Sequence, residues 1–222
     1  MMRRRHRLAL VGLLLAAGAP ELKAQAAQEP LLRGHFALVL QNVRLLSNVR
    51  NRLPTALDAN AGGIDLTLRL RDSRFAAQLY FVEMSEQAAG TGKYSSLAMT
   101  LLFGSETAAG ELGVLRRPGH SPVTDVDLDQ MYSALRLGGR GATALGTTPI
   151  MLGGRAGVYV PLGGSGKSAH GFDLETEVRW VAAKLPVGAS IGYRFERFNV
   201  DRAEQELGAI VTTFSYVFGR SR

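Results

Sequence analysis

Cysteine is absent from the 222-residue sequence. Its absence excludes disulfide bonds, thiolate metal sites, a cysteine nucleophile and a lipoprotein anchor on an N-terminal cysteine. Long apolar runs are also scarce, because only residues 8–19 form one and they are too few to cross a bilayer as a helix. A helical membrane span is therefore not predicted.

The N-terminus has the three parts of a secretory signal. Basic residues fill positions 3–7, the apolar run follows, and Ala24-Gln25-Ala26 forms a cleavage site. We therefore expect residues 1–26 to be a signal peptide and residues 27–222 to form one mature domain. The alternative is that the apolar run is an N-terminal anchor or a buried helix.

The high net charge belongs largely to this segment. Without residues 1–26 the chain keeps 21 basic and 18 acidic side chains, a net charge of +3. Nucleic acid is therefore not predicted as a partner.

A two-residue alternation of apolar and polar side chains recurs along the mature chain. In residues 172–182 the even positions are mostly apolar and the odd positions mostly charged. A period of two indicates β-strands with one apolar and one polar face. The same pattern predicts ten strands, at residues 35–46, 63–71, 74–84, 94–103, 111–116, 131–145, 150–162, 171–184, 187–198 and 207–218.

Short and long connections alternate between these strands. The longer and more polar ones are predicted at 47–62, 85–93, 117–130, 163–170 and 199–206. Short turns on one side and long loops on the other are typical of antiparallel outer-membrane barrels with an even strand count. We therefore predict an all-β, up-and-down transmembrane β-barrel of about ten strands, with both termini on the periplasmic side. Because residues 111–116 form a short and poorly patterned strand, eight strands remain the alternative.

Alternation alone leaves open which face points outward. A membrane barrel turns its apolar face to lipid, whereas a soluble barrel turns it inward. Acids and bases mix on the polar parity of consecutive strands, and glycines are frequent there, which favours a crowded, internally paired lumen. The expected lumen charge network comprises Asp65, Arg69, Arg136, Arg155, Asp173, Glu175, Glu177, Arg179, Arg194 and Glu196.

The last predicted strand contains alternating aromatic residues, Phe214, Tyr216 and Phe218. It resembles the terminal strand of bacterial outer-membrane β-barrel proteins, a broad class, in which such residues form the signal read by the barrel-assembly machinery. The resemblance implies that this machinery is a partner during biogenesis. Here, however, Gly219-Arg220-Ser221-Arg222 follows the final aromatic residue, whereas members of the class usually end on it.

Other motifs indicate ordinary loops. Residues 163–168 lack the first glycine of a phosphate-binding loop, since position 161 is proline, and a strand pattern follows them. The acids at 125, 127 and 129 lack the glycine and glutamate of an EF-hand, so a weak calcium site is the most they could form. His120 and His170 fall on predicted external loops and would be needed by a surface hydrolase.

Opposite charges on consecutive strands carry the functional hypothesis. If residues 171–184 and 187–198 pair with numbers summing to 371, Glu177 faces Arg194 and Arg179 faces Gly192. Such pairs would plug the lumen, because buried charges need partners. We therefore expect a non-enzymatic outer-membrane barrel with a structural, surface-interaction or minor channel role, surrounded by outer-membrane lipid and without a cofactor. The alternatives are an outer-membrane hydrolase that uses the loop histidines and a soluble periplasmic barrel that binds an apolar ligand.

Overall fold

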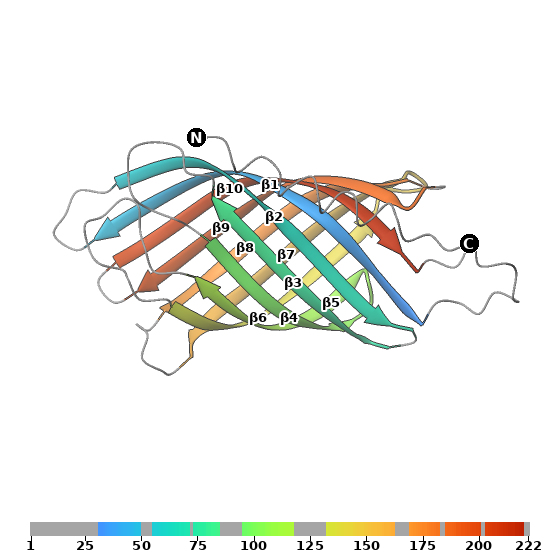
Figure 1. The fold of residues 1–222 in the computed structure, drawn as a ribbon, viewed down its shortest axis with the longest axis horizontal. Coiled ribbons are helices and arrows are strands. Elements are labelled where there is room, and N and C mark those ends of the chain that lie inside the picture. Colours follow the sequence, from blue (N-terminus) through green and yellow to red (C-terminus); the bar gives the residue numbers. More distant parts are fainter. Residues whose placement is uncertain are drawn as a thin grey trace, which may run out of the picture.

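Ten antiparallel strands form the described part of the chain in a computed structural model (Figure 1). The structure describes residues 31–49, 55–71, 73–84, 95–117, 132–162, 169–182, 185–200 and 203–219. No helix among them is long and apolar enough to cross a membrane. The strands are β1 (Leu32–Val49), β2 (Thr55–Leu70), β3 (Phe75–Met84), β4 (Ser95–Gly104), β5 (Ala108–Arg117), β6 (Tyr132–Ala144), β7 (Ile150–Pro161), β8 (Ala169–Val181), β9 (Val187–Val200) and β10 (Ala203–Phe218).

The sheet closes on itself. Each strand pairs with its neighbours in sequence, and β1 pairs with β10 from Gly34 opposite Phe218 to Val49 opposite Ala203. The predicted antiparallel up-and-down barrel of ten strands is confirmed, and the eight-strand alternative is wrong. Leu32, the first residue of β1, and Phe218, the last residue of β10, lie at the same end of the barrel as the short turns. We call this end the turn end and the opposite end the loop end.

Five strands, β1, β2, β5, β9 and β10, are longer than the alternation predicts. β2 begins at Thr55 and β10 at Ala203, so most of the predicted connections 47–62 and 199–206 are strand. On β2 the prediction failed because the outward positions become polar, as at Asp58 and Asn60, and the apolar half of the pattern disappears. β5 also starts earlier than expected and leaves only three residues, 105–107, in the turn before it. The predicted loop at 85–93 lies outside the described residues, and so does the predicted loop at 117–130 except for Arg117, which is the last residue of β5.

The outer face of the barrel carries the apolar side chains of the alternating pattern. Leu38, Met99 and Ile191 are 54%, 63% and 57% exposed, whereas Val39 on the inner face is 1% exposed. This arrangement matches the transmembrane alternative and opposes the soluble one, in which the apolar parity points inward. The strands lean across the barrel wall (Figure 1), and on β9 the outward positions of the belt run from Val187 to Phe195.

Aromatic side chains border the belt at both ends. At the turn end, Phe75 and Phe103 pack edge to face with ring centroids 5.4 Å apart, and Trp180 lies at the end of β8. At the other border, Phe172 and Phe195 pack with centroids 5.9 Å apart. The eight steps from Phe172 to Trp180 cover about 26 Å of strand, or about 20 Å along the axis at a tilt of about 40°.

Side chains also fill the interior. Toward the loop end, apolar residues of β1, β3 and β10, among them Val43, Val82 and Leu207, form a buried cluster. Across the lumen, Tyr159 and Phe198 anchor a second one, with ring centroids 4.6 Å apart. The sequence pattern predicted a polar inner parity, and these apolar layers depart from it.

Candidate functional site

The charged side chains of the inner face meet in the middle of the lumen. Inward-facing positions of consecutive strands supply them, because every second residue of a strand points into the barrel. Each strand from β5 to β9 supplies at least one charge. The residues are Glu111 on β5, Arg136 and Arg140 on β6, Arg155 on β7, Asp173 and Glu175 on β8, and Arg194 and Glu196 on β9.

Glu111 is the centre of this group. Its carboxylate is fully buried and forms ion pairs with Arg136, Arg140 and Arg155, the last with Nε 3.0 Å from Oε2. Three cations around one acid compensate the cost of removing its charge from water. Glu111 therefore ties β5 to both β6 and β7.

Arg136 extends the group to β8. Its Nε donates to Asp173 Oδ1 and its Nη2 to Oδ2, both at 2.8 Å, while its Nη1 contacts Glu111. This two-pronged geometry fixes the guanidinium plane and is the strongest form of carboxylate recognition by arginine. The side chains of Arg136, Glu111 and Asp173 are at most 3% exposed, so the bridge is shielded from solvent.

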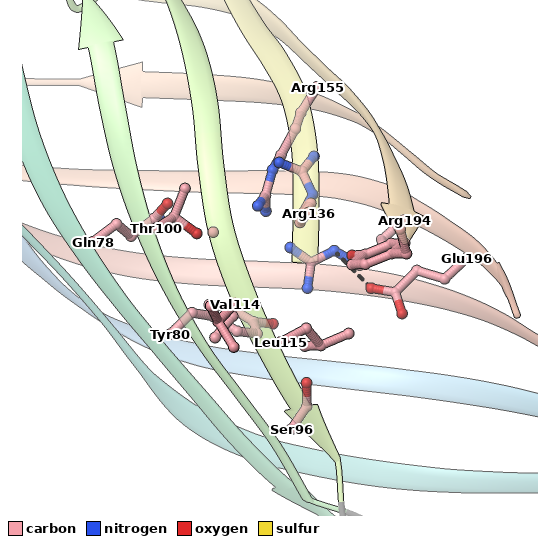
Figure 2. A pocket seen from close by; sticks show the side chains of 13 residues that line it. Gln78, Tyr80, Ser96, Thr100, Val114, Leu115, Arg136, Arg155, Arg194 and Glu196 are labelled. Atoms are coloured by element: carbon pink, nitrogen blue, oxygen red, sulfur yellow. Dashed lines mark ion pairs between the residues drawn. The ribbon is translucent and has the colours of Figure 1, made fainter. Parts of the chain in front are cut away.

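A second set of contacts joins β7, β8 and β9. Arg194 Nη2 lies 2.7 Å from Glu175 Oε2, and Arg155 Nη1 lies 3.7 Å from the same oxygen. Arg194 also lies over the Tyr80 ring, 4.8 Å from its centroid, and 3.8 Å from Glu196, an ion pair drawn in Figure 2. Because Tyr80 belongs to β3, this contact crosses the barrel.

Hydrogen bonds connect these charged residues to the opposite side of the barrel, formed by β1, β2 and β3. Arg140 donates to Gln78 Oε1 on β3, and Gln78 Nε2 donates to Asp65 Oδ2 on β2 at 2.7 Å. His35 of β1 follows, with Nε2 3.8 Å from the second oxygen of Asp65. A chain of polar contacts therefore spans the lumen from β8 to β1.

Glycines on the inner face provide the space for these long side chains. A Cβ atom at Gly157 would lie 2.6 Å from Arg136 Nη2, and one at Gly153 would lie 2.8 Å from Glu177 Oε1. The sequence argument placed glycines on the lumen parity as a sign of crowding, and these two positions agree with it.

A small cavity lies beside this group of charged side chains. It has a volume of about 20 Å³ and lies among Tyr80, Thr100, Arg136 and Arg194, with space for about one water molecule (Figure 2). No group of three or more His, Cys, Asp or Glu side chains in the described ranges is placed to hold a metal ion.

Six residues of the predicted network meet in the two sets of contacts described above. They are Arg136, Arg155, Asp173, Glu175, Arg194 and Glu196. Asp65 joins them through Gln78. Glu177 and Arg179 pair with each other instead. Arg69 lies at the turn end, where its Nη1 donates to the carbonyl oxygens of Ser73 at 3.0 Å and Gly104 at 2.7 Å.

Glu111 and Arg140 were missed as members of the network. The predicted network omits Arg140, and Glu111 is the first residue of the short, poorly patterned strand predicted at 111–116. The available signal was parity, since Glu111, Gly113 and Leu115 alternate with the exposed Leu112 and Val114.

The predicted register of β8 and β9 is wrong by two residues. Glu175, not Glu177, faces Arg194, and Glu177 faces Gly192. The predicted register would require a two-residue turn at Leu185-Pro186. Both favoured two-residue turns need a positive φ angle at their first position, which here is Leu185, and type I′ needs one at Pro186 as well; leucine adopts such an angle only at a steric cost and proline cannot. The strands instead close between Ala182 and Val187, with N and O atoms 3.0 Å apart, and leave four residues for the turn.

Some of the other residues singled out in the sequence lie in the described part of the chain, and others lie outside it. Phe214 and Tyr216 lie on the outer face of β10, and a Cβ at Gly34 would touch the Phe218 ring. His170 is the second residue of β8 and not part of a loop. The signal peptide, His120, the acids at 125–129 and the glycine-rich residues 163–168 lie outside the described residues.

Neither a protein-family model nor the sequence of a curated protein matches this chain. Among solved structures it is similar to Neisserial surface protein A, at 12% identity over 82% of this chain and 96% of that one, with a TM-score of 0.43. It is also similar to Ail of Yersinia pestis (10% identity, 82% and 99%, TM-score 0.31) and to an outer membrane channel of Pseudomonas putida F1 (12%, 88% and 100%, TM-score 0.37). The closed antiparallel barrel of this chain is shown by its own strand pairing.

Proposed function

We propose that the protein spans the bacterial outer membrane as a β-barrel, after removal of its signal peptide. The outward apolar belt supports this placement, since a water-soluble barrel would expose these side chains to solvent at a high cost. The aromatic residues at both borders support it further, because such rings favour the boundary between lipid and water.

Within this placement we propose that the lumen is closed and that the barrel is a structural or surface-interaction protein, not a diffusion pore. The buried bridge Glu111–Arg136–Asp173 carries the proposal, because it lies across the lumen and is sealed from solvent. The buried apolar clusters toward the loop end add an apolar layer inside the lumen, which disfavours the entry of water.

Planar-bilayer recording tests the closed lumen. The wild-type protein should conduct weakly, whereas Glu111→Ala/Arg136→Ala removes two of the three charged side chains of the bridge and should raise the conductance. Arg197→Ala on the outer face of β9 is the control and should leave conductance unchanged. A large, steady wild-type conductance equal to that of the double variant would show that the lumen is open and that the protein is a pore.

A further inference from the structure

Four arginines gather at the turn end of β1, β2 and β3. Arg33 and Arg69 are cross-strand partners, Arg71 follows the end of β2, and Arg74 precedes β3. The backbone N–H of Arg71 donates to Leu31 O at 2.8 Å and so holds Arg71 against the start of β1. We call Arg33, Arg69, Arg71 and Arg74 the arginine rim.

The positive charge of the arginine rim exceeds the acidic charge around it. Arg69 donates to two backbone carbonyl oxygens, which satisfy its N–H groups without neutralising its charge. Glu106, on the next turn, is the one carboxylate at the strand ends and turns of this side that the described ranges include. Asp72, between Arg71 and Ser73, lies outside those ranges, and counting it still leaves a net positive rim.

The loop-end rim of the outer face differs. There Arg44 lies 4.0 Å from Asp58, and Arg197 pairs with both Glu204 and Glu206. At these two positions carboxylates of the chain neutralise exposed arginines, which makes Arg44 and Arg197 suitable controls for the arginine rim.

The depth of the arginine rim indicates the class of its partner. Arg71 directly follows Leu70 and Arg74 directly precedes Phe75, and these two apolar residues are 58% and 59% exposed at the edge of the outer belt. If the belt lies in the hydrocarbon of a bilayer, the adjacent guanidinium groups reach the level of the headgroups, where long basic side chains favour phosphate.

We propose that Arg71 and Arg74 of the arginine rim bind the phosphate groups of anionic phospholipids in the leaflet at the turn end, with Arg33 and Arg69 adding positive charge nearby; this inference rests on the proposed membrane placement. Guanidinium groups match phosphate oxygens with paired hydrogen bonds. Each basic side chain near an anionic surface contributes about fivefold to binding.

Native mass spectrometry of the folded protein in neutral detergent tests this. Phosphatidylglycerol and phosphatidylcholine with the same acyl chains are titrated separately, and bound lipid is counted. Wild type should bind phosphatidylglycerol at least about tenfold more tightly, and Arg71→Gln/Arg74→Gln should lose about 25-fold of that affinity. Arg44→Gln/Arg197→Gln makes the same charge change at the opposite rim and should keep it.

The outcomes separate the alternatives. Equal losses of phosphatidylglycerol affinity in both double variants, or no preference between the two lipids in wild type, would overturn the proposed lipid binding by the arginine rim. Displacement of the lipid by millimolar inorganic phosphate would assign the rim to soluble anions instead. A protein that holds neither lipid would contradict the membrane placement itself. If the double variant fails to fold, Arg74→Gln alone should lose about fivefold, and added salt should weaken phosphatidylglycerol binding more in wild type than in Arg74→Gln.

Discussion

Glu111 illustrates how one residue organises the lumen. Its carboxylate balances three guanidinium groups, from β6 and β7, in a place from which water is excluded. Removing one partner of a buried charge group leaves the remaining charges without compensation, which costs far more than the loss of a surface ion pair.

Glu111→Gln should therefore reduce the free energy of unfolding by about 3–5 kcal/mol, because the amide keeps the shape but not the charge. Urea titration of the protein refolded in lipid vesicles measures this change. The exposed Glu106→Gln is the control and should stay within about 0.5 kcal/mol of wild type. An equally small effect of Glu111→Gln would mean that water reaches the carboxylate.

Gly157 tests the packing of the same network. An added methyl group would lie 2.6–2.8 Å from the guanidinium of Arg136, which its two bonds to Asp173 hold in place. Gly157→Ala should therefore destabilise the barrel by about 1–3 kcal/mol.

The matched control for Gly157 lies three residues away on the opposite face of β7. At Gly154 a Cβ atom would meet its nearest atom, the carbonyl oxygen of Glu175, at 3.6 Å. Gly154→Ala should thus change the unfolding midpoint in urea little. Similar losses in both variants would point to a general need for glycine in β7 and not to contact with Arg136.

At the scale of strands, the pairing of β8 with β9 decides which charges meet. The pair Glu175–Arg194 should show a coupling energy of about 0.5–3 kcal/mol in a double-mutant cycle with alanine. The cycle for Glu177 and Arg194, the partners in the register expected from the sequence, should show a coupling near zero. The reverse result would favour the two-residue shift and contradict the observed register.

The alternation located every strand but not the strand ends. It works where an apolar outer face contrasts with a polar inner one, as along β8. It fails on the first part of β2, where Asp58 and Asn60 make the outer face polar as well. It also undervalued β5, whose inner face combines Glu111 with Gly113 and Leu115. Short β-strands with such mixed faces carry little periodic signal.

At the scale of the whole molecule, the closed sheet and its apolar belt predict an integral membrane protein. The protein should stay in the membrane pellet after alkaline carbonate extraction. On gels it should migrate faster before boiling than after it, because small barrels resist detergent until heated. Release of the folded protein into the carbonate supernatant would instead support the soluble barrel.

Sequence by itself determined the class of fold and most of the charged residues of the lumen. Side chains alternate with a strict period of two in a strand, so parity could be read directly from residues such as Asp173 and Leu174. Only the tertiary structure decided which charges pair, because partners across a barrel depend on register, and a two-residue shift preserves parity while it exchanges Glu177 for Glu175. The central position of Glu111 followed only from closure of the sheet, which brings the side chains of β5 to β8 to one place in the lumen.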